Sequence, residues 1–255
     1  MDPIQQLATR RIELDRAFDE IKTQIAETNE ELIDRVTHHG GRAMSEAPPL
    51  ILKCRDVIKK HGNFMIFAGM PGSGKTHLIR TLPNLSRSLV VDFEGGLRTV
   101  ADCDVDVAEI RKTKDFDRLL DELEHGSLIG QYDFLFIDGM TALADMVLAE
   151  QSQDPKDYIA KYGKLIDLVM GYCKRFKLMP FDVVATCGIN RNIENGLYDM
   201  MQPGRKLPVK ICYEPDFVGA CVVKQKPDGS TVYGIQVANR SPYEFCKARD
   251  PYRAL

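Results

Sequence analysis

The sequence of 255 residues lacks the segments that mark membrane and secreted proteins. No apolar run approaches the length of about 18–20 residues that crosses a bilayer. The first residues, MDPIQQLATR, contain no apolar stretch of the kind found in a signal peptide. We therefore expect a soluble protein of the cytoplasm without a membrane partner. With 44% hydrophobic and 28% charged residues, the composition also excludes a wholly disordered chain.

An excess of positive charge is also absent. The chain has 34 Lys and Arg residues against 37 Asp and Glu residues, a net charge of −3. Residues 1–43 hold six basic and nine acidic residues, so the remainder of the chain is neutral. Since strong polyanion binders usually carry a basic excess, any nucleic-acid site must be a local patch. The seven cysteines form no C-x-x-C pair, which excludes a zinc ribbon and favours free thiols.

The sequence predicts two domains, residues 1–43 and residues 44–255. The first reads as one helix from Met1 to about Val36, with apolar residues at seven of ten heptad seam positions. Such a helix either binds a partner or a second copy of the chain, or folds back on its own domain. Gly40 and Gly41 end it, and a linker follows.

Strands and helices alternate after Leu50, which predicts an α/β fold with a mainly parallel sheet. The expected strands are 64–68, 88–92, 105–110, 132–137 and 181–186. The expected helices are 50–60, 76–82, 115–125, 142–151 and 157–177. Residues 191–208 read as a loop, and residues 217–223 and 231–237 as a C-terminal β-hairpin.

The segment GMPGSGKT, Gly69–Thr76, fits the phosphate-binding pattern G-x-x-x-x-G-K-[ST] without deviation. It follows an apolar strand and opens a helix, which is the context that this Walker A motif requires. Lys75 is expected to reach the β- and γ-phosphates of ATP, and the Thr76 hydroxyl to bind Mg²⁺. The expected nucleotide-binding residues are Gly69, Pro71, Gly72, Ser73, Gly74, Lys75, Thr76 and His77.

Two carboxylates are expected at the same edge of the sheet. Asp138 ends the apolar strand FLFID, 62 residues after Thr76, and takes the Walker B role of holding the Mg²⁺ shell. The gap leaves room for another strand between the two motifs, which favours the P-loop ATPases with an inserted strand. Glu94, in VVDFEGGL, follows another strand and is expected to orient or deprotonate the water that attacks ATP.

Together, GMPGSGKT, VVDFEGGL, FLFIDGMTALADM and VVATCGIN resemble the RecA-like ATPases of phages, including the Sak-type recombination and single-strand annealing proteins. The resemblance covers about residues 63–255. It implies a RecA-like fold, Glu94 as the water-activating residue, and a host-cytoplasmic, Mg²⁺-dependent ATPase that supports phage recombination or annealing. It also implies a sensor of the γ-phosphate at the end of the strand after Walker B, for which Thr186 and Asn190 are the candidates.

The same resemblance suggests where partners bind. Single-stranded DNA is expected on the segment after the sensor strand, through Arg191, Tyr198, Arg205 and Lys206. The resemblance further implies a homo-oligomer, as a ring or a filament, and contacts with single-strand-binding or other replication and recombination proteins. Lys247 and Arg249 are candidates to reach the ATP of a neighbouring subunit.

Two other functions fit the same motifs. A nucleotide or small-molecule kinase shares the phosphate loop, with Asp92 or Glu94 as the base, although no Arg-rich lid segment is evident. A nucleotide-gated adaptor would bind ATP without turnover and recruit a partner through the heptad helix.

Overall fold

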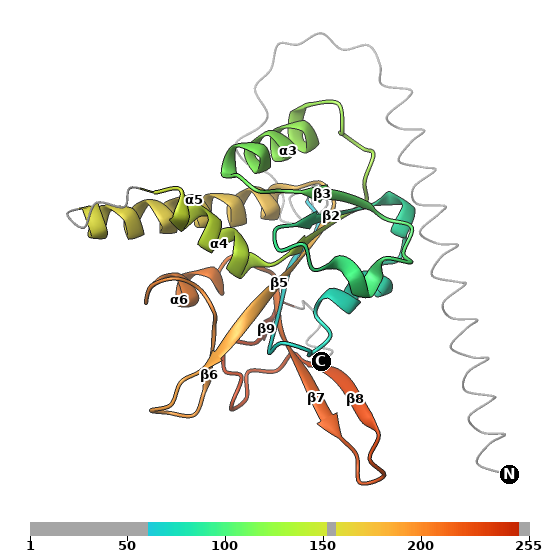
Figure 1. Ribbon diagram of the computed structural model, residues 1–255, viewed down its shortest axis with the longest axis vertical. Helices are drawn as coiled ribbons and strands as arrows, with labels where there is room; N and C mark the ends of the chain where they lie inside the picture. Colours follow the sequence, from blue (N-terminus) through green and yellow to red (C-terminus); the bar gives the residue numbers. More distant parts are fainter. Residues whose placement is uncertain (1–60, 152–156, 250–255) are drawn as a thin grey trace, which may run out of the picture. The chain divides into compact units, whose positions relative to one another are not determined.

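The computed structural model describes residues 61–151 and 157–249 (Figure 1). The helices expected over 1–36 and 50–60 lie outside the described residues. Nine strands of the described chain form the sheet, namely β1 Phe64–Gly69, β2 Ser88–Asp92, β3 Asp106–Glu109, β4 Phe134–Asp138, β5 Asp182–Arg191, β6 Tyr198–Met200, β7 Phe217–Gln225, β8 Thr231–Gln236 and β9 Lys247–Ala248.

The strand order along the sheet is β3-β2-β4-β5-β1-β7-β8, with β6 beside β5 and β9 beside β7. Strands β3, β2, β4, β5, β1 and β7 run parallel to one another, whereas β6, β8 and β9 pair antiparallel with their neighbours. The predicted α/β class, the mainly parallel sheet and the C-terminal hairpin are confirmed. Strands β2 and β3 lie in the sequence gap between the two motifs, where another strand was expected, and in the sheet β5 separates the phosphate-loop strand β1 from the Walker B strand β4.

Helices and short 3₁₀ turns cover the sheet. The helices are α3 Thr113–His125, α4 Met140–Ala149, α5 Tyr158–Leu178 and α6 Leu207–Ile211, and the 3₁₀ turns are η1 Thr76–Thr81, η2 Leu85–Arg87 and η3 Leu97–Val100. Strand β1 shows how period-two alternation supplies both faces. Its Phe64 and Ile66 join the larger core, whereas Met65 and Phe67 pack on the smaller one with η1.

The helices α3, α4 and α5 contribute buried residues to the larger core. Phe116 of α3 is fully buried and contacts Phe93, Tyr172 and Phe176 edge to face, with ring centroids 5.0–6.1 Å apart. This aromatic group joins α3 and α5 to the β2 end of the sheet. The cysteines among the described residues are free, as expected. None of the helices in residues 61–151 and 157–249 has both the length and the hydropathy to cross a membrane.

The prediction that residues 191–208 form a loop is wrong in part. Strand β5 continues to Arg191 and pairs with β6, and α6 begins at Leu207. Ile189 of β5 faces Met200 of β6, and both are almost fully buried. This buried apolar pair stabilises a hairpin whose other residues are mostly polar, and for that reason the sequence alone suggested a loop.

Candidate nucleotide-binding site

The phosphate loop joins β1 to η1 at the carboxyl edge of the sheet. Gly72 and Gly74 adopt positive φ values of 74° and 87°, which a residue with a side chain rarely adopts. The Lys75 ammonium donates to the carbonyls of Gly69 and Met70 at 3.0 Å each, so it lies across the loop that an anion would occupy. Among the described residues, the buried Ser73 hydroxyl has no hydrogen-bond partner. Pro71 and His77, also predicted at this site, are exposed beside it.

Asp138 lies next to the loop, as predicted. The Thr76 hydroxyl donates to Asp138 Oδ2 at 3.0 Å, and the Thr186 hydroxyl donates to Asp138 Oδ1 at 2.8 Å. Thr186 also accepts the backbone N–H of Gly139 at 2.9 Å. Burial raises the pKa of Asp138, and the two hydroxyl bonds act in the opposite direction. The β5 strand thus brings Thr186 directly onto the Walker B carboxylate.

Glu94 reaches the same point from the turn after β2. Asp92 fixes this turn, because its Oδ1 accepts the N–H groups of Glu94 and Gly95 at 3.0 and 2.7 Å. A Cβ atom on Gly139 would lie only 3.0 Å from Glu94 Oε1, and Gly139 has a φ of 107°. Glycine therefore permits both the turn and the approach of Glu94. Displacement of water and the charge of Asp138 raise the pKa of Glu94, as expected of a general base.

These residues fit a magnesium nucleotide. Among the described residues, no group of three or more His, Cys, Asp or Glu side chains is placed to hold a metal ion. Mg²⁺ rarely has an all-protein cage and is usually held by one or two protein oxygens together with phosphates and water. Thr76 and Asp138 supply such oxygens, and Lys75 supplies the positive charge for the phosphates. When bound, the ion would polarise the phosphate oxygens.

Asn190 is not at this site. It lies four residues beyond Thr186 on β5, roughly 13 Å along the strand at 3.3 Å per residue. There it is exposed and pairs with Asp199 of β6. The structure therefore brings Thr186, but not Asn190, to the Walker B carboxylate, and places Asn190 in the hairpin with the predicted DNA-binding residues.

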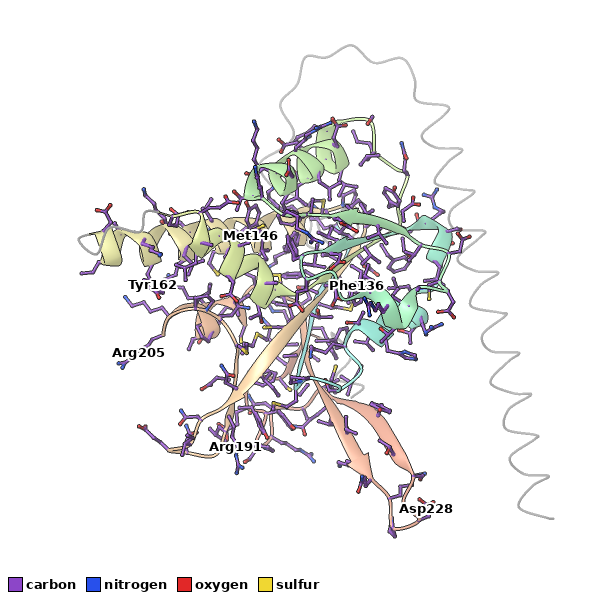
Figure 2. All side chains as sticks on the ribbon, viewed as in Figure 1. Phe136, Met146, Tyr162, Arg191, Arg205 and Asp228 are labelled. Carbon is purple, nitrogen blue, oxygen red and sulfur yellow. The ribbon has the colours of Figure 1, made fainter. Side chains whose placement is uncertain are left out.

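The predicted DNA-binding residues occupy the hairpin and the segment after it. Arg191 ends β5 opposite Tyr198 of β6, and Arg205 and Lys206 are exposed just before α6 (Figure 2). The Tyr198 ring stacks on Tyr243, with centroids 5.0 Å apart and planes 15° apart. One face of Tyr198 is therefore already covered, and a base could stack only on the other face.

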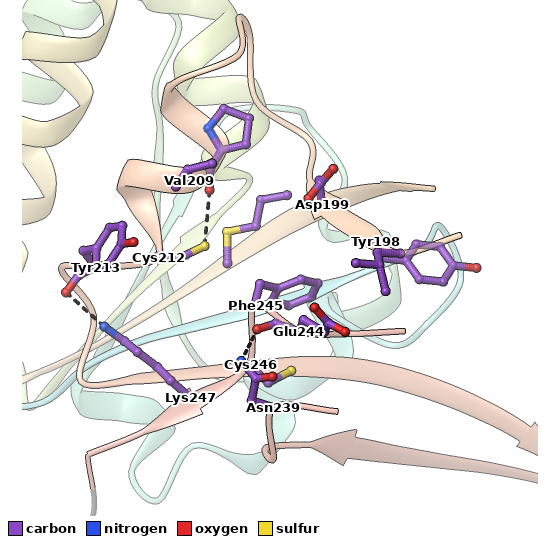
Figure 3. Close-up of a pocket in the computed structure, with 13 residues that line it drawn as sticks. Tyr198, Asp199, Val209, Cys212, Tyr213, Asn239, Glu244, Phe245, Cys246 and Lys247 are labelled. Carbon is purple, nitrogen blue, oxygen red and sulfur yellow. Dashed lines mark hydrogen bonds between the residues drawn. The ribbon is translucent and has the colours of Figure 1, made fainter. Parts of the chain in front are cut away.

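Lys247 and Arg249 lie away from the phosphate loop of their own chain. Lys247 of β9 pairs with Val218 of β7, which is level with Ile66 near the amino-terminal end of β1. Both side chains donate to the Tyr213 carbonyl, at 2.9 and 3.0 Å. Lys247 also lines a pocket of about 400 Å³, and Figure 3 shows it on the side of this pocket opposite Tyr198.

Tyr233 lies beside the phosphate loop, although no motif in the sequence predicts it there. A ring carbon of Tyr233, on β8, lies 3.4 Å from the position that a Cβ atom would take on Gly74. Tyr233 is 61% exposed, so an aromatic residue faces solvent beside the loop. No local motif marks Tyr233, because β8 reaches the loop only through the pairing of β8 with β7 and of β7 with β1.

Comparisons with known proteins place this site in a family. A solved structure of a KaiC-like protein from Pyrococcus horikoshii matches 69% of this chain and 80% of its own, with 12% identity and a TM-score of 0.42. A search of curated proteins finds no match. A family model described as an AAA domain matches residues 61–243, a span that includes the phosphate loop, Glu94, Asp138 and Thr186. Because this match covers most of the chain, the protein belongs to this family of AAA domains and is a P-loop ATPase.

Proposed function

We propose that the protein is a Mg²⁺-dependent ATPase that binds single-stranded DNA and supports phage recombination or strand annealing. One observation carries the proposal: the strand that contacts the Walker B carboxylate also carries an exposed arginine at its far end. Thr186 bonds Asp138, and the same strand β5 runs on to Arg191 in the exposed hairpin. Strand β5 therefore connects the nucleotide site to the exposed hairpin that bears Arg191.

At the nucleotide site we assign each residue a distinct role. Lys75 neutralises the phosphates, and Thr76 and Asp138 hold the Mg²⁺ shell. Glu94 orients and deprotonates water, for which its raised pKa suits it. Thr186 holds the Asp138 carboxylate by a hydrogen bond of 2.8 Å.

The proposed DNA-binding site is a local basic patch on a chain without overall positive charge. Arg191, Arg205 and Lys206 can each neutralise a phosphate, and the half-buried ring of Tyr198 can stack on a base with the face that Tyr243 does not cover. Glu194 and Asp199 reduce the local charge, so we expect binding of moderate strength that is sensitive to salt.

Oligomerisation belongs to the same proposal. Lys247 and Arg249 lie far along the sheet from their own phosphate loop, so they would act only on the ATP of a neighbouring copy. Mixing inactive Lys75→Ala chains with inactive Lys247→Ala/Arg249→Ala chains tests this, because shared sites would recover part of the ATPase activity. No recovery in mixed oligomers would remove the two residues from the proposal.

DNA binding is tested with a fluorescent oligo(dT) and anisotropy across a salt series. Arg205→Gln/Lys206→Gln removes two charges from the patch, so the slope of log K against log salt falls by about 1.4, at 0.7 for each lost phosphate contact. The matched control, Lys112→Gln/Lys114→Gln, removes two exposed charges at the start of α3, far from the hairpin (Figure 1). Equal losses in the two variants would mean that the patch is not the DNA site.

Turnover is tested by the steady-state ATPase rate with Mg²⁺, with and without single-stranded DNA, against Lys75→Ala as the blank. Stimulation by DNA that is absent from the blank is the expected result. Phosphate transfer to a nucleoside acceptor would favour the kinase, and tight ATP binding without turnover would favour the adaptor.

A further inference from the structure

The first turn of α4 carries a threonine for which the nucleotide chemistry has no use. Thr141 lies three residues after Asp138, and its hydroxyl contacts two other elements. It accepts the backbone N–H of Gly188 on β5 at 3.1 Å and donates to the carbonyl of Met201 at 2.8 Å. The Thr141 hydroxyl therefore connects α4 to β5 and to Met201, the residue just after β6.

Met201 is held against β5 and Thr141 by both of its backbone polar groups. The Met201 N–H donates to the Gly188 carbonyl at 2.8 Å, so Met201 is bonded through its N–H to β5 and through its carbonyl to Thr141. A Cβ atom on Gly188 would lie 3.3 Å from both the Thr141 hydroxyl and the Met201 Cβ, which leaves little room for a side chain. Gly188 is itself two residues beyond Thr186, whose hydroxyl holds Asp138.

Residues 201–206, here called the basic segment, begin at this junction and bear Arg205 and Lys206. The next residue, Gln202, is held weakly, because its side-chain amide donates to the Cys187 sulfur, a poor acceptor, at 3.3 Å. Its carbonyl oxygen is buried without a hydrogen-bond partner among the described residues. At the other end of the segment, Leu207 is fully buried in the core. The exposed part of the basic segment therefore lies between Met201, which Thr141 holds, and the buried Leu207.

We propose that Thr141 is the positioning residue that couples the nucleotide site to the basic segment. This rests on the proposed binding of single-stranded DNA. A nucleotide that shifts Asp138 and the start of α4 moves the Thr141 hydroxyl, and the hydroxyl moves the Met201 carbonyl and the basic segment that bears Arg205 and Lys206. By thermodynamic reciprocity, DNA on the basic segment changes nucleotide affinity by the same factor.

The test compares Thr141→Val, which keeps the shape but removes the hydroxyl, with Thr141→Ser, which keeps the hydroxyl. Two affinities are measured for each protein: that of a labelled oligo(dT) with and without a non-hydrolysable ATP analogue, and that of a fluorescent ATP analogue with and without oligo(dT). In the wild type and Thr141→Ser, each ligand tightens the other by one common factor. In Thr141→Val this factor falls at least about threefold, as expected for loss of one coupling contact. The basal ATPase rate without DNA stays within about twofold of the wild type.

The outcomes separate this inference from the proposed function. If the wild type fails to bind oligo(dT), the proposed function fails first. If the wild type binds DNA but shows no coupling, or Thr141→Val keeps it in full, the positioning role is refuted while DNA binding stands. Should Thr141→Val unfold, hydrogen exchange in the wild type decides. The Met201 amide is expected to change its exchange rate when the nucleotide binds, and an unchanged rate overturns the inference.

Discussion

Replacing Thr186 with valine tests the link between β5 and the Walker B carboxylate. The substitution keeps the shape of a side chain that is 1% exposed and removes only its hydroxyl. Two hydrogen bonds disappear, one donated to Asp138 at 2.8 Å and one accepted from Gly139 N–H at 2.9 Å. A hydrogen bond to a charged group contributes about 1.5–3 kcal/mol. The Gly139 N–H keeps a second acceptor, the Ile137 carbonyl at 3.2 Å, so the loss of its bond to Thr186 adds at most about 1 kcal/mol. Because the two effects overlap, we expect the free energy of unfolding to fall by about 2–4 kcal/mol.

Urea denaturation without nucleotide measures this loss. With an m value of about 3 kcal/mol/M, the midpoint moves down by roughly 1 M while m stays the same. The matched control is Thr231→Val on the exposed strand β8, where we expect a change within about 0.5 kcal/mol. In an Asp138→Asn background, Thr186→Val should cost less, because the charged partner is gone. A loss below about 0.5 kcal/mol, or the same cost in both backgrounds, would refute the reasoning.

The remaining predictions concern catalysis, nucleotide contact and pH. Glu94→Gln should lower kcat at least about 100-fold while ATP affinity persists, and retained turnover would exclude Glu94 as the base. Tyr233→Ala should raise the KM for ATP about 5- to 30-fold through lost stacking, whereas Tyr233→Phe should not. Inhibition by inorganic tripolyphosphate, which has no base, should be unchanged in Tyr233→Ala, and an equal loss there would assign Tyr233 to the shape of the loop. Burial and Arg249 lower the pKa of Lys247 to about 8. Above that pH the folded state releases a proton that the unfolded state keeps to about pH 10.4, so the contribution of Lys247 to stability rises with pH by up to about 1 kcal/mol after allowance for solvent screening. Lys247→Met should lose this contribution, so the difference in free energy of unfolding between wild type and variant should change by that amount from pH 7 to pH 10, and a constant difference would refute the assignment.

Much of the fold could be read from the sequence. Strand β2 has the predicted bounds, and the bounds of β1, β4, α3 and α5 differ from prediction by two residues at most. These elements are marked by apolar runs or helical periodicity, which depend on local burial alone. The extension of β5 and the strand β6 were missed, because polar residues surround the single buried pair Ile189 and Met200 that holds them.

Local sequence patterns were enough to predict the residues of the nucleotide site. The spacing in GMPGSGKT, the strand that ends in Asp138 and the turn that carries Glu94 are local patterns, because each is set by a backbone shape within a few residues. The tertiary structure alone decided the neighbours of these groups: Thr186 on Asp138, Tyr233 on Gly74, and Thr141 on Met201. It also decided that Lys247 lies away from its own phosphate loop. Pairing between distant strands brings these residues together, and a hydrophobic pattern records which residues are buried without recording which strand lies beside which.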